Sequence, residues 1–356
     1  MKNRIYVCHT FYHVYVTFLK EFQLPREEWG NATLVLSKMS NDFAGLKERI
    51  EKLKFFEAVY EYDEKSEENF PDLQKYRHQE QNFIKALWNR YRYTKKLGKY
   101  QEQYVPVCFK DYKERFVYCD SDPIGYYLNY KHIPYYALED GLDCLVHFDA
   151  ARFDNRGHFG LKAFLSSKLN VIFIQNGYGR YCIDMEVNNI SAIKHSCPKY
   201  VEVPRRPMVE ALTREQKDIL LQAFVKNMDH LLHTMEQGEY HDNKVLILTE
   251  PLCDLETRER IFKDLIAEYG VRAQIYLKPH PRDVLDYETL FADRLIIDKT
   301  VPMEMLNFIE NLKFQKVVSV LTVLDGITFA EEKIRLGSDF MDKYEAPEIH
   351  RQNEFI

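Results

Sequence analysis

The stretch QIYLKPHPRD, residues 274–283, decides the fold, because an apolar run is followed at once by two prolines. The run 274–277 is typical of a buried strand. Pro279 and Pro281 cannot continue the strand and hold their neighbours extended. They therefore predict that His280 lies on a stiff turn at the carboxyl end of the strand, where open α/β sheets bind ligands.

A His-Pro turn alone is also typical of a surface loop with a capping His. Lys278 and Arg282 flank this turn, however, and suit an anionic ligand. A second motif, EDG (139–141), ends another apolar run, residues 134–138. Two adjacent carboxylates at a strand end are poor structural residues and good acid/base groups, so the two motifs together favour a catalytic site.

The composition is that of a globular protein with two domains. The 356 residues exceed one typical core, and 46% are hydrophobic and 29% charged. A net charge of -6 does not indicate binding to nucleic acid. The seven cysteines form no CxxC pair and no metal-ligand spacing, so we expect buried free thiols in a reducing cytoplasm. No run has the length of a membrane span, and the chain starts with a strand pattern instead of a signal peptide.

Strand and helix patterns alternate along the chain, which predicts a doubly wound parallel α/β architecture. The predicted strands are 5–8, 32–36, 58–62, 116–119, 135–138, 170–174, 245–248, 274–277, 295–297 and 316–318. The predicted helices are 11–19, 42–54, 73–96, 123–130, 212–236, 257–269, 303–311 and one from about 322. A polar stretch at 237–243 resembles a linker, so we predict Rossmann-like domains at 1–240 and 241–356, facing each other across a cleft. Neither half contains GxGxxG or a P-loop, so ordinary dinucleotide and ATP sites are unsupported.

Strand ends of the second half carry polar groups that suit a nucleotide. Ser319 and Thr322 lie at a predicted strand-to-helix turn, where hydroxyls and free N–H groups bind phosphate. Glu304 opens another predicted helix and suits ribose hydroxyls. Glu250 and Asp254 follow the first strand of this half. Each of the helix-start residues could instead serve only as a helix cap or first-turn acid.

Three further segments have a functional and a structural interpretation. The segment HTFYH (9–13), with His9 and Thr10, follows the first strand and could contact the acceptor or sialic acid, or only pack a loop. Asn176, a further candidate sugar contact, lies in the flexible NGYGR segment, which could close over the substrate or be a simple loop. The DSDP sequence at 120–123 indicates a helix start more than an Asp-x-Asp metal site. The basic helix near 85–99 is typical of a solvated face but could also dock on an anionic membrane leaflet.

The ordered set of motifs resembles the bacterial sialyltransferases of glycosyltransferase families 38, 52 and 80. An acidic pair followed by Gly lies in the first domain, and a His-Pro motif, a Pro-x-Glu turn and a Ser/Thr-bearing strand end follow in the second. The local similarity is best to family 52, the lipooligosaccharide sialyltransferase group, between Leu277 and Thr322.

This resemblance implies a GT-B fold and an inverting transfer of sialic acid from CMP-sialic acid to a hydroxyl of a cell-surface glycan of lipooligosaccharide or capsule type. It implies no metal or other cofactor. By the resemblance, Asp140 of the pair Glu139–Asp140 is the general base, and His280 binds the CMP phosphate as acid or electrostatic stabiliser. The donor site then comprises Lys278, Pro281, Arg282, Glu304, Ser319, Thr322 and Glu250.

In family 52 the base lies on the loop after the first strand of the second domain, here Glu250 to Asp254. Asp254 or Glu250 therefore competes with Asp140 for that role. Other donors, such as CMP-Kdo or a nucleotide-diphospho-sugar, would suit the same fold. The remaining alternatives are a polyol-phosphate polymer enzyme that shares the His-Pro turn, and a sugar-binding relative without activity.

Overall fold

The computed structural model describes residues 2–39, 42–77, 80, 82–118, 120–141, 145, 158–193, 197–236 and 243–350. Its contacts divide the chain into two units, Met1–Leu212 and Thr213–Ile356. This division precedes the predicted boundary at residue 240, which itself lies outside the described residues. Helix α10 (Met228–Glu236) belongs to the second unit because its end bonds to that unit. Met235 O accepts hydrogen bonds from Lys244 Nζ at 2.6 Å and from Tyr276 OH at 3.1 Å.

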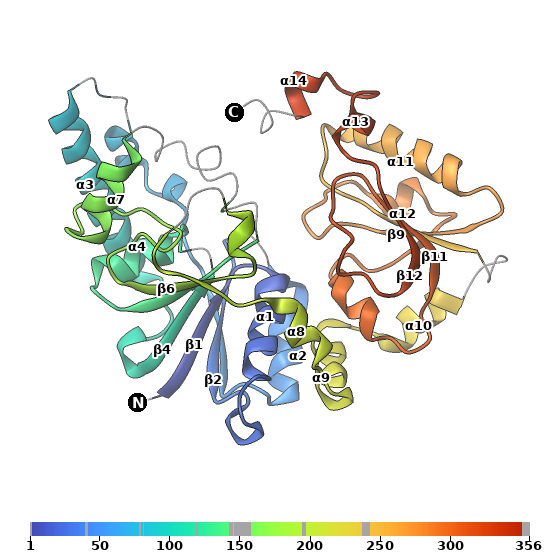
Figure 1. Ribbon diagram of the computed structural model, residues 1–356, viewed down its shortest axis with the longest axis horizontal. Coiled ribbons are helices and arrows are strands. Elements are labelled where there is room, and N and C mark those ends of the chain that lie inside the picture. Colours follow the sequence, from blue (N-terminus) through green and yellow to red (C-terminus); the bar gives the residue numbers. More distant parts are fainter. Residues whose placement is uncertain are drawn as a thin grey trace. The chain divides into compact units, whose positions relative to one another are not determined.

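The first unit contains a seven-stranded sheet whose neighbouring strands are all parallel (Figure 1). In spatial order its strands are β3 (Ala58–Tyr62), β2 (Ala32–Ser37), β1 (Lys2–Cys8), β4 (Tyr112–Tyr118), β5 (Tyr135–Leu138), β6 (Cys182–Val187) and β7 (Tyr200–Glu202). The order reverses between β1 and β4, and the carboxyl ends of strands at such a point form the usual ligand site of these sheets.

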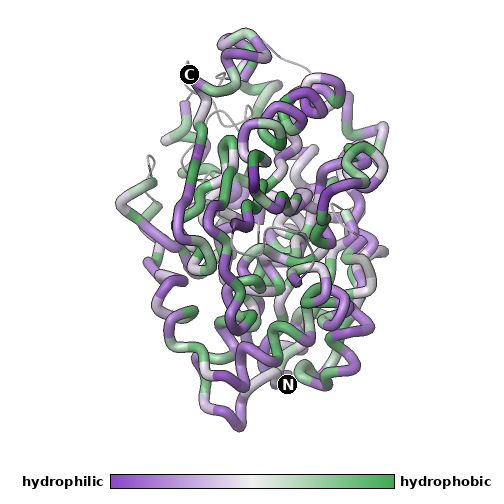
Figure 2. The backbone as a smooth tube through the Cα atoms, turned by 90° about the vertical axis from the view of Figure 1, so that its right-hand side faces the viewer, coloured by the Kyte–Doolittle hydropathy of each residue, from purple (hydrophilic) through white to green (hydrophobic). Residues whose placement is uncertain are grey.

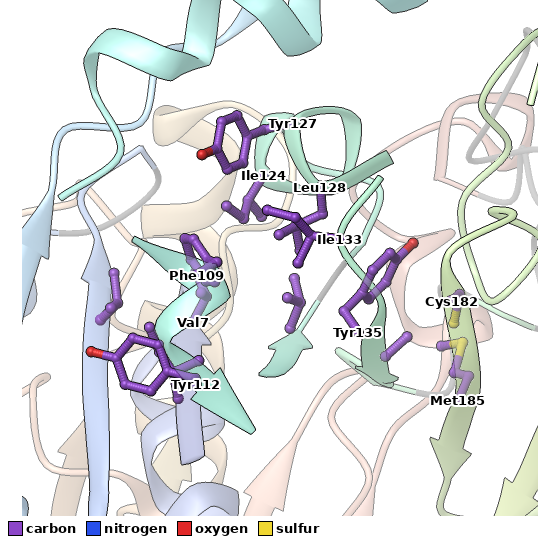
Figure 3. Close-up of a cluster of buried hydrophobic side chains, with 14 of the residues drawn as sticks. Val7, Phe109, Tyr112, Ile124, Tyr127, Leu128, Ile133, Tyr135, Cys182 and Met185 are labelled. Carbon is purple, nitrogen blue, oxygen red and sulfur yellow. The ribbon is translucent and has the colours of Figure 1, made fainter. Parts of the chain in front are cut away.

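Amphipathic helices cover this sheet, as the alternation of patterns predicts. They are α1 (Phe11–Glu21), α2 (Leu46–Leu53), α3 (Phe83–Tyr100), α4 (Pro123–Tyr130), α7 (Phe159–Ser167) and α8 (Arg205–Glu210). Between sheet and helices lies a core that includes Val7, Ile124, Leu128 and Tyr135 (Figure 3). The predicted start of α4 is confirmed, because Pro123 occupies its first turn directly after Asp122.

The second unit repeats the arrangement with five parallel strands. Their order is β10 (Leu295–Ile296), β9 (Gln274–Lys278), β8 (Lys244–Leu248), β11 (Phe314–Ser319) and β12 (Ala330–Arg335). Its helices are α9 (Arg214–Phe224), α10, α11 (Leu255–Tyr269), α12 (Tyr287–Leu290), α13 (Ser338–Met341), α14 (Pro347–His350) and the 3-10 helix η9 (Met303–Phe308). The strand order here reverses between β8 and β11.

One predicted strand, 170–174, is wrong. Ile172, Phe173 and Ile174 are fully buried, but the backbone N–H of Ile174 donates to Ser166 Oγ at 3.0 Å instead of to a neighbouring strand. The sheet position is taken by β6, whose residues alternate between buried and exposed positions and include Asp184 and Glu186. Burial of an apolar run therefore does not by itself indicate a strand.

Several helix predictions also differ from the structure. In place of one helix over 73–96, a 3-10 helix (Pro71–Tyr76) precedes α3, which begins at Phe83, and the helix predicted at 303–311 is the short 3-10 helix η9. The segment 212–236 forms two helices, because Val225 adopts an extended conformation after α9. No helix follows β11; residues 320–329 form a loop that leads to β12. The predicted helix N-terminus at Thr322 is thus absent.

None of the described helices combines the length and hydropathy needed to cross a membrane. Hydrophobic and hydrophilic residues interleave closely along the backbone (Figure 2). Cys8, Cys182 and Cys197 are buried free thiols as predicted, whereas Cys108 is exposed. Cys119 and Cys144 lie outside the described residues.

Candidate active site

The acidic motif after β5 separates into a structural and an accessible carboxylate. Glu139 is buried; its carboxylate accepts from Arg205 Nη1 at 2.7 Å and from the backbone N–H of Asn188 at 2.8 Å. The Asp140 side chain is 39% exposed to solvent. The structure therefore gives Glu139 a structural role, because its oxygens hold α8 and the end of β6.

Asp140 hydrogen bonds to a histidine that sequence reasoning missed. His13 lies on α1 and contacts Asp140 Oδ1 through Nε2. Its ring is fully buried and stacks on Tyr118 at a centroid distance of 4.4 Å and an interplanar angle of 9°. The HTFYH segment at residues 9–13 signalled a functional stretch, but nothing in the sequence indicates that His13 meets a residue 127 positions away.

The predicted acceptor contacts of the first unit have local structural partners. His9 is buried, with Nε2 at 2.8 Å from Glu64 Oε2, and Thr10 caps α1 by accepting from the N–H of His13. Burial opposes a charge on His9, but Asp122 and Glu64 outweigh it and raise the pKa to about 9. Asn176 is buried and donates its N–H to Asp120 Oδ1 at 2.6 Å. These contacts assign the three residues to the framework of the sheet edge.

In the second unit, the turn after β9 presents His280 as a neutral hydrogen-bond donor. The N–H of Arg282 donates to His280 Nδ1 at 3.1 Å, so the ring proton lies on Nε2. Burial, with the nearby cations Arg282 and Lys278, lowers the pKa of His280 to about 4. The side chain is half-buried. The backbone N–H of His280 donates to Thr249 Oγ1 at 3.2 Å.

A buried ion pair holds this turn in place. Asp283 accepts from Arg258 Nη1 at 2.6 Å and from Tyr287 OH at 2.8 Å. The same guanidinium donates to Leu252 O at 2.6 Å and Cys253 O at 2.8 Å. One arginine therefore ties the loop after β8 to the His-Pro turn, and this rigidity suits a site that must orient a ligand.

Lys278 is a buried cation beside this turn. Its Nζ donates to Pro279 O at 3.1 Å and to Lys299 O at 3.2 Å. Burial lowers its pKa to about 8, although the charges of Asp298 and Glu304 act in the opposite direction. Burial also raises the pKa of Glu304, which lies at the start of η9. A phosphate bound beside Lys278 would supply a counter-charge to its ammonium group.

The predicted phosphate turn after β11 is already occupied by a carboxylate. Glu250 is buried, and its Oε1 accepts from the backbone N–H groups of Val320, Leu321 and Thr322 at 3.1, 3.0 and 2.9 Å. Ser319 is fully buried and donates to Thr322 O at 2.7 Å, so it shapes the turn and does not face a ligand. The backbone N–H groups that the sequence predicted to bind phosphate therefore bind Glu250 instead. Of the residues predicted for this turn, only Thr322, whose side chain is half-buried, stays available as a ligand group.

Asp254, the competing base, caps helix α11. It is exposed, and its Oδ1 accepts from the N–H of Thr257 at 3.0 Å. Hydrogen bonds from Thr257 lower its pKa. The Asp254 carboxylate therefore serves as the N-cap of α11, and this structural role is the reason why we favour Asp140 as the base.

Comparison with known proteins shows the family of this chain. Residues 62–325 match glycosyltransferase family 52. An uncharacterized protein of Haemophilus influenzae is 30% identical over 94 residues, which are 25% of this chain and 30% of that protein, so the chain spans less than a third of this relative's length.

Solved sialyltransferase structures are similar to this chain at low identity. An α/β-galactoside α-2,3-sialyltransferase from Photobacterium phosphoreum has a TM-score of 0.51 and 12% identity, over 92% of this chain and 88% of that one. A Photobacterium 2,6-sialyltransferase, solved with the donor product CMP and the acceptor lactose, has a TM-score of 0.35 and 12% identity, over 91% and 59% of the two chains. The chain belongs to glycosyltransferase family 52, and its two parallel sheets form a GT-B fold.

Proposed function

We propose that this enzyme transfers sialic acid from CMP-sialic acid to a hydroxyl of a cell-surface glycan of lipooligosaccharide or capsule type, with inversion and without a metal ion. The observation that carries the proposal is the His280 turn, which combines a neutral Nε2–H donor with the buried cation Lys278. One imidazole donor and one ammonium suit a single phosphate as the leaving group. The likeness to sialyltransferase structures and the family match support the choice of donor.

In the proposed reaction, different residues handle the acceptor proton and the leaving phosphate. Asp140 accepts the proton of the acceptor hydroxyl while the new C–O bond forms at the anomeric carbon. The bond from that carbon to the phosphate oxygen breaks, and CMP leaves with its charge stabilised by His280, Lys278 and the exposed Arg282. Glu304 and the Thr322 hydroxyl complete the proposed donor site.

Nucleotide binding tests the donor. In thermal-shift measurements with CMP, UDP, GDP and ADP, only CMP is expected to raise the melting temperature, because ligand that binds the folded state stabilises it. EDTA is expected to leave both the CMP shift and the transferase activity unchanged. Stabilisation by UDP or GDP without CMP would indicate another donor, and equal transfer from CMP-Kdo would reassign the sugar. Loss of activity in EDTA would contradict the metal-free reaction.

Lys278→Met tests the buried cation. The pKa of Lys278 is about 8 in the folded protein against 10.5 ordinarily, so between these values the unfolded chain binds more protons and stability rises with pH. At pH 7 we expect the variant, which carries no buried charge, to be more stable by roughly 1–3 kcal/mol. Its CMP affinity is expected to fall about tenfold, since a charged hydrogen bond is lost. Denaturant melts from pH 7 to 10 and calorimetry measure both; a less stable variant with normal CMP affinity would contradict the assignment.

We further propose that α3 contacts an anionic lipid surface, near a lipid-linked acceptor. Ile84 is 77% and Trp88 52% exposed, and Arg92 lies 5.0 Å over the Trp88 ring. Lys95 of α3 donates to Asn170 O after α7, so the two helices lie side by side (Figure 1). Exposed aromatic and aliphatic side chains next to cations are typical of helices that lie in the lipid interface.

Vesicle sedimentation tests this surface. The double variant Ile84→Ser, Trp88→Ser is expected to lose most binding to vesicles with 30% phosphatidylglycerol. Val271→Ser is the control, because Val271 is 74% exposed but lies on the second unit. Equal binding of both variants and the unchanged protein would refute the contact.

A further inference from the structure

We propose that His13 is the positioning residue for the base: it donates one hydrogen bond to Asp140 and thereby fixes the orientation of the carboxylate that receives the acceptor proton. The inference rests on the proposed function, in which Asp140 is that base. It adds a residue from α1 to the site, 127 positions from its partner.

The direction of the hydrogen bond follows from the backbone. The N–H of His9 donates to His13 Nδ1 at 3.0 Å, so this nitrogen carries a lone pair and the ring proton lies on Nε2. Nε2 is the atom that contacts Asp140 Oδ1. His13 is therefore the donor and Asp140 the acceptor, and His13 has no free nitrogen with which to act as a base itself.

The charges around His13 keep its ring neutral. Burial lowers the pKa of His13 to about 4, and the nearby cations His9 and Arg205 act in the same direction, against Asp140. Glu64 and Asp122 act on this site through His9, which they hold as a cation, and Glu139 is paired with Arg205. A neutral donor stabilises the ionised form of the carboxylate it contacts, which is the form that accepts a proton.

Packing prevents the ring from turning away. His13 is fully buried, stacks on Tyr118 and has its backbone N–H bonded to Thr10 Oγ1 at 3.2 Å. Its carbonyl accepts from Thr17 Oγ1 at 2.9 Å. During transfer the acceptor proton moves to Asp140 and the Nε2–H of His13 stays in place, so His13 neither gains nor loses a proton.

Two matched variants test the role. Gln places its amide near Nε2 of a histidine and Asn near Nδ1, while both remove the ring that stacks on Tyr118. His13→Gln is expected to keep activity within about fivefold, whereas His13→Asn lowers kcat/KM by about 10–100-fold, as the loss of a supporting hydrogen bond commonly does. The acidic limb of kcat/KM against pH is expected to move to higher pH in His13→Asn only, with CMP affinity unchanged in both.

Several outcomes would overturn the inference. Equal losses in both variants, with an unmoved acidic limb, would show that the ring serves packing alone. Ring ¹⁵N shifts that place the proton of wild-type His13 on Nδ1 alone would overturn the donor role even if neither variant folds, because Nε2 would then have no hydrogen to donate. Asp140→Asn separates the two proposals: if it is inactive while His13→Asn behaves as wild type, only the positioning role fails, and if it is active, the base assignment fails first.

Discussion

Asp140→Asn is expected to abolish transfer, with a loss of roughly 10²–10⁴-fold or more in kcat, because the amide keeps the shape of the carboxylate but cannot accept the acceptor proton. The side chain is 39% exposed, so the substitution creates no buried unpaired group and the melting temperature is expected to change little. CMP affinity, measured by calorimetry, is expected to stay near the wild-type value, since the proposed nucleotide site lies on the second unit.

Asp254→Asn is the matched control for this experiment. Asp254 is an exposed N-cap of α11 that accepts from the N–H of Thr257. An Asn cap is nearly as good as an Asp cap, so stability is expected to be kept and activity to fall only slightly. An inactive Asp254→Asn together with an active Asp140→Asn would reverse the assignment and place the base on the loop after β8.

His280→Ala is expected to lower kcat/KM by roughly 10²–10⁴-fold, because the leaving phosphate loses its neutral Nε2–H donor. The His280 side chain is only half-buried, and Asp283 and Arg258 hold the turn independently of the imidazole. The melting temperature is therefore expected to move by only a few degrees, which steady-state kinetics and calorimetry together would establish.

His230→Ala provides the control for the loss of an imidazole. His230 is exposed on α10, and its neighbours bond only to its backbone. Wild-type kinetics are expected from this variant. A fully active His280→Ala would refute the phosphate role, whereas a His280→Ala that melts far below wild type would assign the imidazole to the stability of the turn.

Much of the fold could be predicted because parallel strands are buried on both faces and read as short apolar runs. Residues 32–36 and 135–138 are such runs and form β2 and β5. The strand β6 was missed because its polar residues break such a run, and residues 170–174 were mistaken for a strand because a buried loop is equally apolar. The loop at 320–329 differs from the predicted helix because Glu250, far away in sequence, fixes its backbone.

From the sequence, only those residues of the candidate site that lie in a local motif could be predicted. His280 and Asp140 were found because each ends an apolar run next to other polar residues. Their partners were not found: Arg205 meets Glu139 across 66 positions and His13 meets Asp140 across 127. Periodicity reports contacts along one element, while these contacts join different strands and helices at one edge of the sheet.

The position of Glu250 determines how the second unit can recognise an anion. Backbone N–H groups attract anions at any pH, but those of residues 320–322 already serve Glu250. Recognition is therefore left to side chains, and the central one, Lys278, loses its proton as the pH rises through about 8. For the proposed phosphate site we therefore expect affinity to fall as the solution becomes alkaline, and high ionic strength is expected to weaken the contribution of the exposed Arg282 as well.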